Sequence, residues 1–280
     1  MQLNMGQAWN EATAMLSANR DTVLAVVGLF FFLPYFALAL FVPEAINPTP
    51  VEAPPGTDPE VAMNAAFAAL QQQYTDNWVY FVILAVAQFT GTLSLLALLT
   101  DRTRPTVGEA LMQGLKSTPS YLVSQILVAL FAGIAVGLPL GIVGAFLPPA
   151  FAVLIGIMLL GVVLYLVVKF SLIAPVIAIE SELNPFKAML RSWSLTKGNS
   201  FRLISFFILL IIAIGVVSLL ITMVLGTVFS AFDQSIANIG NGVVSGLINA
   251  AVGALLLAVL AAVHRQLAGP SREAMTETFE

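Results

Sequence analysis

The stretch Leu203–Phe229, LISFFILLIIAIGVVSLLITMVLGTVF, runs for 27 residues without an Asp, Glu, Lys or Arg. Because an α-helix rises about 1.5 Å per residue, about 20 residues are enough to cross the hydrocarbon layer of a membrane. Five further windows share this property: Thr22–Val42, Trp78–Leu99, Tyr121–Phe146, Ala150–Val168 and Val243–Val263. The sequence therefore predicts an all-α integral membrane protein, with six transmembrane helices in a single polytopic domain over residues 1–280.

The composition supports this class and excludes others. Of the 280 residues, 59% are hydrophobic and 9% are charged, and the mean hydropathy is +0.96, whereas about 25% of residues in soluble domains are charged. The net charge of −4 argues against nucleic acid as a partner. The absence of cysteine excludes disulfides and thiolate chemistry, and a single histidine, His264, argues against a catalytic triad or a histidine metal site. We expect no metal and no cofactor.

The basic residues indicate the orientation. They fall in alternate loops, at Arg20, Arg102, Arg104, Lys116, Lys169, Lys187, Arg191, Lys197, Arg202, Arg265 and Arg272, while the loops Pro43–Asn77, Leu147–Pro149 and Ser230–Gly242 have none. Lys and Arg near helix ends are retained on the cytoplasmic side. This predicts a multi-pass protein of the bacterial inner membrane with both termini cytoplasmic, a periplasmic loop over 43–77 and a cytoplasmic tail over 264–280.

The periplasmic loop contains one helix signal. Asp58 as N-cap and Pro59 at the first helical position predict a helix to about Gln73. Its apolar side is modest. It fits a helix lying on the outer surface or covering the bundle, and a solvated loop with a helical stretch fits equally.

Each outward helix is preceded by a short amphipathic segment. The signals are Met5, Trp9, Ala12 and Leu16 in the first; the capping box Thr106 and Glu109 in the second; and in the third Asn184 as cap, Pro185, the apolar face Phe186, Met189, Leu190 and Trp193, the basic face Lys187 and Arg191, and Gly198 as stop. Such helices lie in the membrane interface. The pattern predicts three helical hairpins, each preceded by a cytoplasmic interfacial helix. It fits a threefold internal repeat, and it equally fits the general tendency of such segments to be amphipathic.

Small residues recur every four positions in the third span, at Ala129, Gly133, Gly137 and Gly141. They place a helix-packing groove on one face, where another backbone can approach closely. Packing inside the bundle is the favoured interpretation, and a lipid-tail groove or a homodimer face would use the same residues. Pro139 predicts a kink in this helix.

Lys169 is unusual because apolar sequence flanks it on both sides. A buried charge is costly unless it snorkels to the interface, meets a carboxylate or faces water. Snorkelling is the favoured interpretation. As a functional alternative, Lys169 and Arg191 hold a lipid phosphate, with Lys187 and Lys197 as further head-group candidates.

The spans contain no acidic residue, which argues against an ion-coupled transporter. Their polar groups, among them Gln88, Gln125 and Asn249, are explained by hydrogen bonds between helices.

The segment from Lys169 to Arg202 carries a family resemblance. It contains Ser-Leu-Ile-Ala-Pro175, Glu180, Asn184-Pro185-Phe186-Lys187-Ala188 and Arg191-Ser-Trp-Ser-Leu-Thr-Lys-Gly-Asn199. This segment resembles the membrane domain of bacterial glycerophosphoryl diester phosphodiesterases, and it is similar to the YciC-like inner-membrane proteins. The resemblance implies membrane residence and a lipid-related role. In the phosphodiesterases a soluble catalytic barrel follows the membrane region, whereas seventeen residues follow Val263 here, so the hydrolytic activity is not carried over.

These observations lead to one expected function and one alternative. We expect a non-enzymatic inner-membrane protein, a lipid-related or envelope-organising accessory or scaffold. Its expected partners are membrane lipids, above all anionic phospholipid, with a membrane-protein partner or a second copy also open. The alternative is a small-solute permease with a pathway between the helical hairpins.

Overall fold

A computed structural model describes residues 2–46, 57–100, 106–146 and 149–269. Within these ranges every regular element is helical. The elements are α1 (Met5–Ala18), α2 (Arg20–Val27), the π-helical turn η1 (Gly28–Phe32), α3 (Leu33–Phe41), α4 (Pro43–Ile46), α5 (Pro59–Thr100), α6 (Val107–Ala132), the π-helical turn η2 (Gly133–Gly137), α7 (Leu138–Phe146), α8 (Pro149–Phe170), α9 (Ile173–Ile179), α10 (Pro185–Leu195), α11 (Ser200–Phe229) and α12 (Gln234–Ala268). Arg102, Arg104, Arg272 and most of the tail lie outside the described residues.

Six helical stretches in the described ranges are long and apolar enough to cross a membrane, which confirms the predicted all-α class and the expected number of such helices. They are Arg20–Phe41, Val61–Thr100, Val107–Phe146, Val153–Ile179, Ser200–Phe229 and Gln234–Ala268. Several are longer than the predicted windows. The predicted helix at Asp58–Gln73 begins at Pro59 as expected but continues to Thr100, because no helix-breaking residue separates it from the span at Trp78.

The predicted caps at Thr106 and Asn184 are present. Each side chain accepts a hydrogen bond from the backbone N–H three residues later, and Glu109 completes the capping box at Thr106. Asn4 caps α1 in the same way, although no cap was predicted there. The first and third segments form separate helices, α1 and α10. The second prediction was wrong in one respect, since α6 runs unbroken through Pro119 into its span.

In two spans a wider, π-helical turn precedes a proline. The π-helical turns η1 and η2 lie just before Leu33-Pro34 and Leu138-Pro139. Proline has no N–H, so the carbonyl four residues earlier loses its α-helical partner. The π-helical turn is the local adjustment at the expected site of the Pro139 kink, and the helix continues beyond it.

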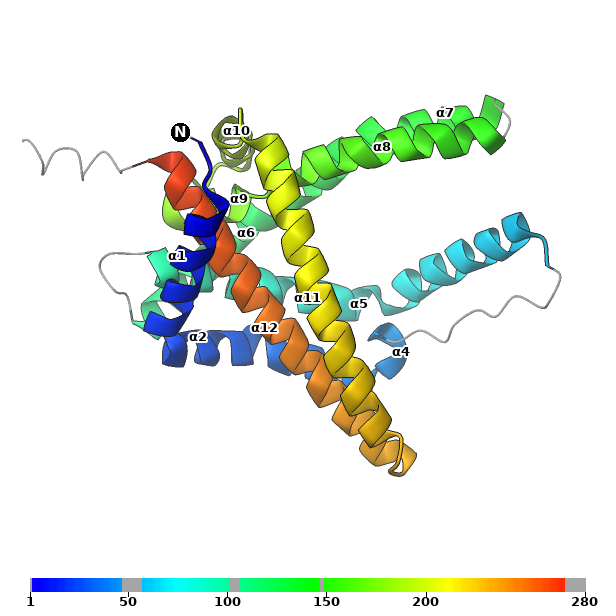
Figure 1. Ribbon diagram of the computed structural model, residues 1–280, viewed down its shortest axis with the longest axis horizontal. Helices are drawn as coiled ribbons and strands as arrows, with labels where there is room; N and C mark the ends of the chain where they lie inside the picture. The colour runs from blue at the N-terminus through cyan, green and yellow to red at the C-terminus, as the bar shows by residue number, and fades with distance from the viewer. Residues whose placement is uncertain (1, 47–56, 101–105, 147–148, 270–280) are drawn as a thin grey trace, which may run out of the picture.

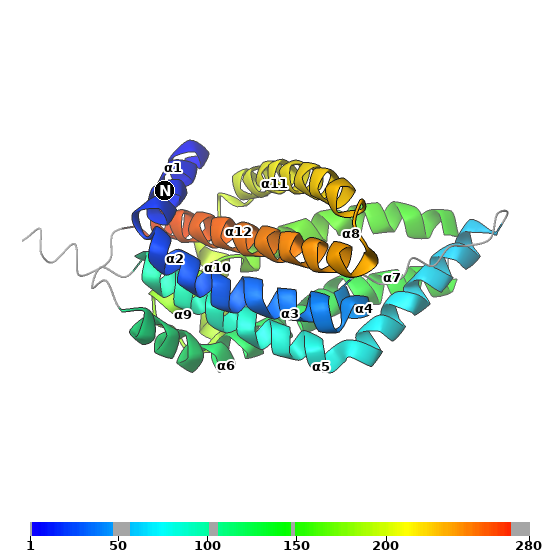
Figure 2. The same ribbon diagram turned by 90° about the horizontal axis from the view of Figure 1, so that it is seen from below.

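Helix α12 lies between α11 and the α2–α3 segment (Figure 2). Its small residues admit aromatic side chains: a Cβ added at Gly253 would lie 2.8 Å from Phe31, and one at Gly246 would lie 2.9 Å from Phe32. Hydrogen in place of a side chain thus lets the first span approach α12 closely. The three successive phenylalanines of η1 therefore pack against glycines of the neighbouring helices α5 and α12.

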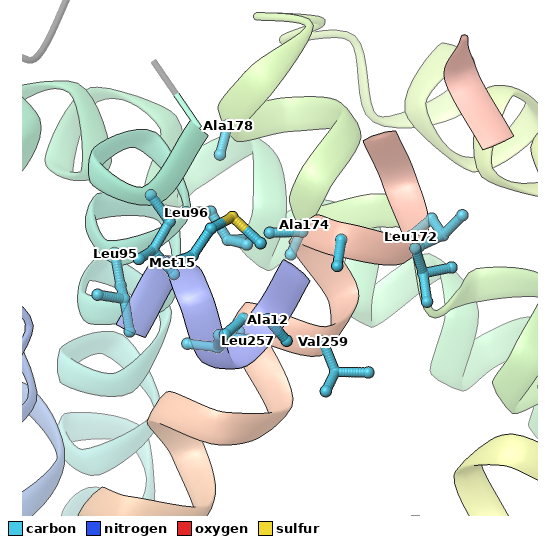
Figure 3. Close-up of a cluster of buried hydrophobic side chains, with 14 of the residues drawn as sticks. Ala12, Met15, Leu95, Leu96, Leu172, Ala174, Ala178, Leu257 and Val259 are labelled. Carbon is cyan, nitrogen blue, oxygen red and sulfur yellow. The ribbon is translucent and has the colours of Figure 1, made fainter. Parts of the chain in front are cut away.

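The best-packed part of the protein lies at one end of the bundle. Side chains of α1, α5, α9 and α12 meet there, as Figure 3 shows, among them Ala12, Met15, Leu95, Leu96, Leu172, Ala174, Ala178, Leu257 and Val259. Both ends of the described chain are tied to this region, because the N–H of Asn4 donates to Gln266 Oε1 at 3.1 Å. In contrast, α7, α8 and the first half of α5 project away from it (Figure 1).

Candidate functional site

The candidate site begins at the break between α8 and α9. Pro175 cannot donate to the carbonyl of Ser171, and the helix is interrupted at Ser171–Leu172. Ser192 of α10 bridges this break: its hydroxyl donates to the carbonyl of Lys169 at 2.7 Å and accepts from the N–H of Leu172 at 3.2 Å. Ser192 is buried, so these bonds hold α10 against the end of the fourth span.

Lys169 does not snorkel. The residue is 2% exposed, and its ammonium lies 5.1 Å from the ring centroid of Trp193 and 5.4 Å from that of Tyr165. It also donates to the carbonyl of Trp193 at 3.4 Å. The snorkelling interpretation was therefore wrong, because two aromatic faces and a carbonyl stabilise the cation inside the protein. This arrangement also withholds Lys169 from direct contact with a lipid head group.

Glu180 joins α10 to α12. Its carboxylate accepts from Arg191 Nε at 2.9 Å and lies 2.9 Å from His264 Nε2. Burial acts to raise the pKa of Glu180, but the hydrogen bonds and charges of His264 and Arg191 lower it to about 2. The side chain of His264 is 4% exposed and faces Glu180.

The structure shows which side of α10 meets the protein. Ala188, Ser192 and Leu195 form the buried face, because small side chains let α10 lie close to the break. Phe186 and Leu190, which the prediction placed in the membrane interface, are 62% and 71% exposed. They share the outer surface with bases, of which Lys187, Arg191 and, just after the helix, Lys197 are exposed.

Three of the four predicted head-group residues, Lys187, Arg191 and Lys197, are thus exposed on or just after α10, and the fourth, Lys169, is buried. Lys197 lies near enough to act on Lys169 electrostatically. Sequence reasoning missed Ser192 and the contact between His264 and Glu180. The signal available for Ser192 was its position within the segment that carries the family resemblance. No such signal was available for the contact between His264 and Glu180, which are 84 residues apart.

The predicted helix-packing groove is not filled by another part of the described chain. Ala129, Gly133, Gly137 and Gly141 are exposed, and no described atom outside the local helix lies within 4 Å of a Cβ built at these three glycines. Packing inside the bundle was therefore wrong for this face, because α7 and α8 project away from the other spans (Figure 1).

Within the described ranges no three His, Cys, Asp or Glu residues could hold a metal ion. In the spans, Gln88 of α5 donates to Asn249 of α12 at 3.5 Å. This pair links two helices, as interhelical polar groups commonly do.

Comparison with known protein families, with characterised proteins and with solved structures finds no match to this chain.

Proposed function

We propose that this chain is a non-enzymatic, lipid-related accessory or scaffold protein of the bacterial inner membrane, which binds anionic phospholipid at the outer surface of α10. One observation carries the proposal: the exposed side chains Phe186 and Leu190 lie on the same short helix as the exposed bases Lys187 and Arg191. A helix of this kind lies in the interface, with its apolar side chains among acyl chains and its bases near lipid phosphates.

The inner face of α10 supports the same proposal. Ser192 and the Glu180–Arg191 pair hold the helix against the ends of α8 and α12, so its outer surface has a defined position. Arg191 uses its Nε–H for Glu180, and a guanidinium carries four further N–H donors on its two terminal nitrogens. Arg191 can therefore keep its internal ion pair while it donates to a phosphate.

The cytoplasmic orientation is part of this proposal. Arg20 at the start of α2, Arg202 at the start of α11 and Arg265 near the end of α12 all lie where the helices of the packed end begin or finish. Bases gathered at one end of a bundle favour the cytoplasmic, anionic leaflet for that end.

Less supports the alternative of a small-solute permease. Such a protein needs polar groups along a water-filled path, whereas Gln88 and Asn249 satisfy each other. The lipid-binding proposal uses the exposed groups of α10 directly.

The test compares lipid retention by native mass spectrometry, using the full chain purified in mild detergent with phosphatidylglycerol. Each base near an anionic surface contributes about 1 kcal/mol. The double variant Lys187→Ala/Lys197→Ala should therefore bind phosphatidylglycerol roughly thirtyfold more weakly. Arg20→Ala is the matched control, because Arg20 is also exposed but lies on α2 beside Asp21. Equal retention by wild type and the double variant, or an equal loss in the control, would contradict the proposal.

A further inference from the structure

A second feature of the structure is a pocket of about 580 Å³ between η1, α5 and α6. This volume lies within the range of about 300–1,000 Å³ found for small-molecule sites. The residues that carry the argument are Phe30 of η1, Val86 and Thr90 of α5, and Leu111, Met112 and Leu115 of α6.

The walls of the pocket are fixed by two close approaches of backbone. A Cβ added at Gly91 would overlap Phe30, so α5 lies directly against the side chain that forms one wall. A Cβ added at Gly114 would lie 2.8 Å from the carbonyl oxygen of Thr90, which brings α6 equally close to α5. The cavity beside these contacts is therefore built into the packing of three helices.

The lining offers contact area but no free hydrogen-bonding group among its side chains. Thr90 supplies the hydroxyl of the lining, and this hydroxyl bonds to the carbonyl of Val86 at 2.9 Å and to Thr118 Oγ1 at 3.0 Å. The other lining residues are apolar or glycine. A ligand there gains burial of apolar surface alone, which selects a hydrocarbon chain over a polar solute.

The surroundings of the pocket indicate which molecule supplies the hydrocarbon chain. All three lining elements belong to stretches long and apolar enough to span a membrane, and Ile83, Met112 and Leu115 at the pocket are exposed. The molecules that meet an exposed surface of this kind in a bilayer are phospholipids. Met112 adds a flexible side chain that adapts to an irregular hydrocarbon shape.

From these observations we infer that the pocket between η1, α5 and α6 is a binding site for one acyl chain of a membrane phospholipid. The inference rests on the membrane residence in the proposed function, but it does not rest on the head-group surface of α10. The site binds the acyl chain, and its affinity does not depend on the charge of the lipid head group.

The experiment uses the full chain in phosphatidylcholine nanodiscs that contain a phosphatidylcholine with a photoreactive diazirine near the middle of one acyl chain. Cross-linked peptides are mapped by mass spectrometry. Wild-type protein should show several-fold more cross-linking on the α6 segment around Met112 and Leu115 than on α11, whose exposed residues such as Leu219 do not line this pocket. Equal labelling of both segments, or none on α6, would overturn the inference, and the wild-type comparison needs no variant to fold.

A variant adds a second test. Ala87→Phe places a larger side chain in the pocket and should lower cross-linking on α6 several-fold, to the level of α11. Ala213→Phe on the exposed surface of α11 is the matched control and should leave the α6 signal unchanged. An Ala87→Phe protein that labels α11 normally and α6 as strongly as wild type would also overturn the inference.

The two proposals fail separately. The Lys187→Ala/Lys197→Ala variant should lose phosphatidylglycerol and keep its α6 cross-linking with neutral lipid. Loss of the α6 signal in that variant would contradict an independent acyl-chain site, whereas unchanged phosphatidylglycerol binding with normal α6 labelling would contradict the head-group proposal alone.

Discussion

Ser192→Ala tests whether one hydroxyl holds α10 to the break between α8 and α9. The substitution removes the bond to the Lys169 carbonyl and the bond from the Leu172 N–H, both of which lie in the buried interior. It changes neither the charge of the chain nor the outer surface of α10. Any effect therefore comes from the two backbone groups that lose their partner.

The magnitude follows from the cost of leaving such groups unpaired. A buried donor or acceptor without a hydrogen bond costs about 1–3 kcal/mol. The Lys169 carbonyl and the Leu172 N–H lie close together and their surroundings adjust jointly. We therefore expect the free energy of unfolding to fall by about 2–4 kcal/mol in total, rather than by the full sum of two separate losses. At roughly 2–4 °C per kcal/mol for a chain of this order of length, the melting temperature should fall by roughly 5–15 °C.

The assay is thermal unfolding in mild detergent, followed by tryptophan fluorescence, for which the adjacent Trp193 is a local reporter. Ser194→Ala is the control, because Ser194 is exposed and its hydroxyl donates only along its own helix, to the carbonyl of Arg191 at 2.8 Å. That change should stay within about 0.5 kcal/mol. If Ser192→Ala is as mild as Ser194→Ala, the bridging role of Ser192 is refuted.

Two further predictions concern other contacts. The pKa of Glu180 is lowered to about 2 from 4.5, so its pairing stabilises the fold above pH 4.5 and this contribution is lost as the pH falls towards 2. In an acid titration followed by near-UV circular dichroism, Glu180→Gln should therefore depend less on pH between 4.5 and 2 than the wild type does. Identical titration curves for the two proteins would contradict the pairing. Gly114→Ala should destabilise by about 1–3 kcal/mol, because its Cβ would meet the carbonyl oxygen of Thr90. Gly137→Ala, where the space is open, should be neutral in the same melting assay, and equal effects of the two changes would argue against the close approach of α5 and α6.

The sequence predicts local features of this protein well. The absence of charge over about 20 residues identifies each span, since the cost of a charge in hydrocarbon acts on every residue of the window. The caps at Thr106 and Asn184 were equally legible, because a cap depends on residues three positions apart.

Long-range contacts were less legible. The sequence places Phe186 and Leu190 on the apolar face of an interfacial helix, but which residues α10 buries against the protein depends on which side of it meets α8 and α9. The small residues Ala188 and Ser192 decide this, because they allow the closer approach. Likewise, the stabilisation of Lys169 by Tyr165 and Trp193 depends on α10 returning to the end of α8, which no local pattern encodes.

The distribution of burial is typical of a chain whose helices cross a membrane. The polar bridges of Ser192 and Glu180 lie at the packed end, whereas side chains on the projecting spans, such as Phe146 and Met158, are 81% and 74% exposed. In water such surfaces would associate with one another, but in a bilayer acyl chains cover them at no hydrophobic cost. Under the proposed function, the packed end fixes where the spans begin and lipid covers their projecting ends. A protein built this way has lipid contact as part of its structure, which is the physical basis for expecting both its surface helix and its apolar pocket to bind phospholipid.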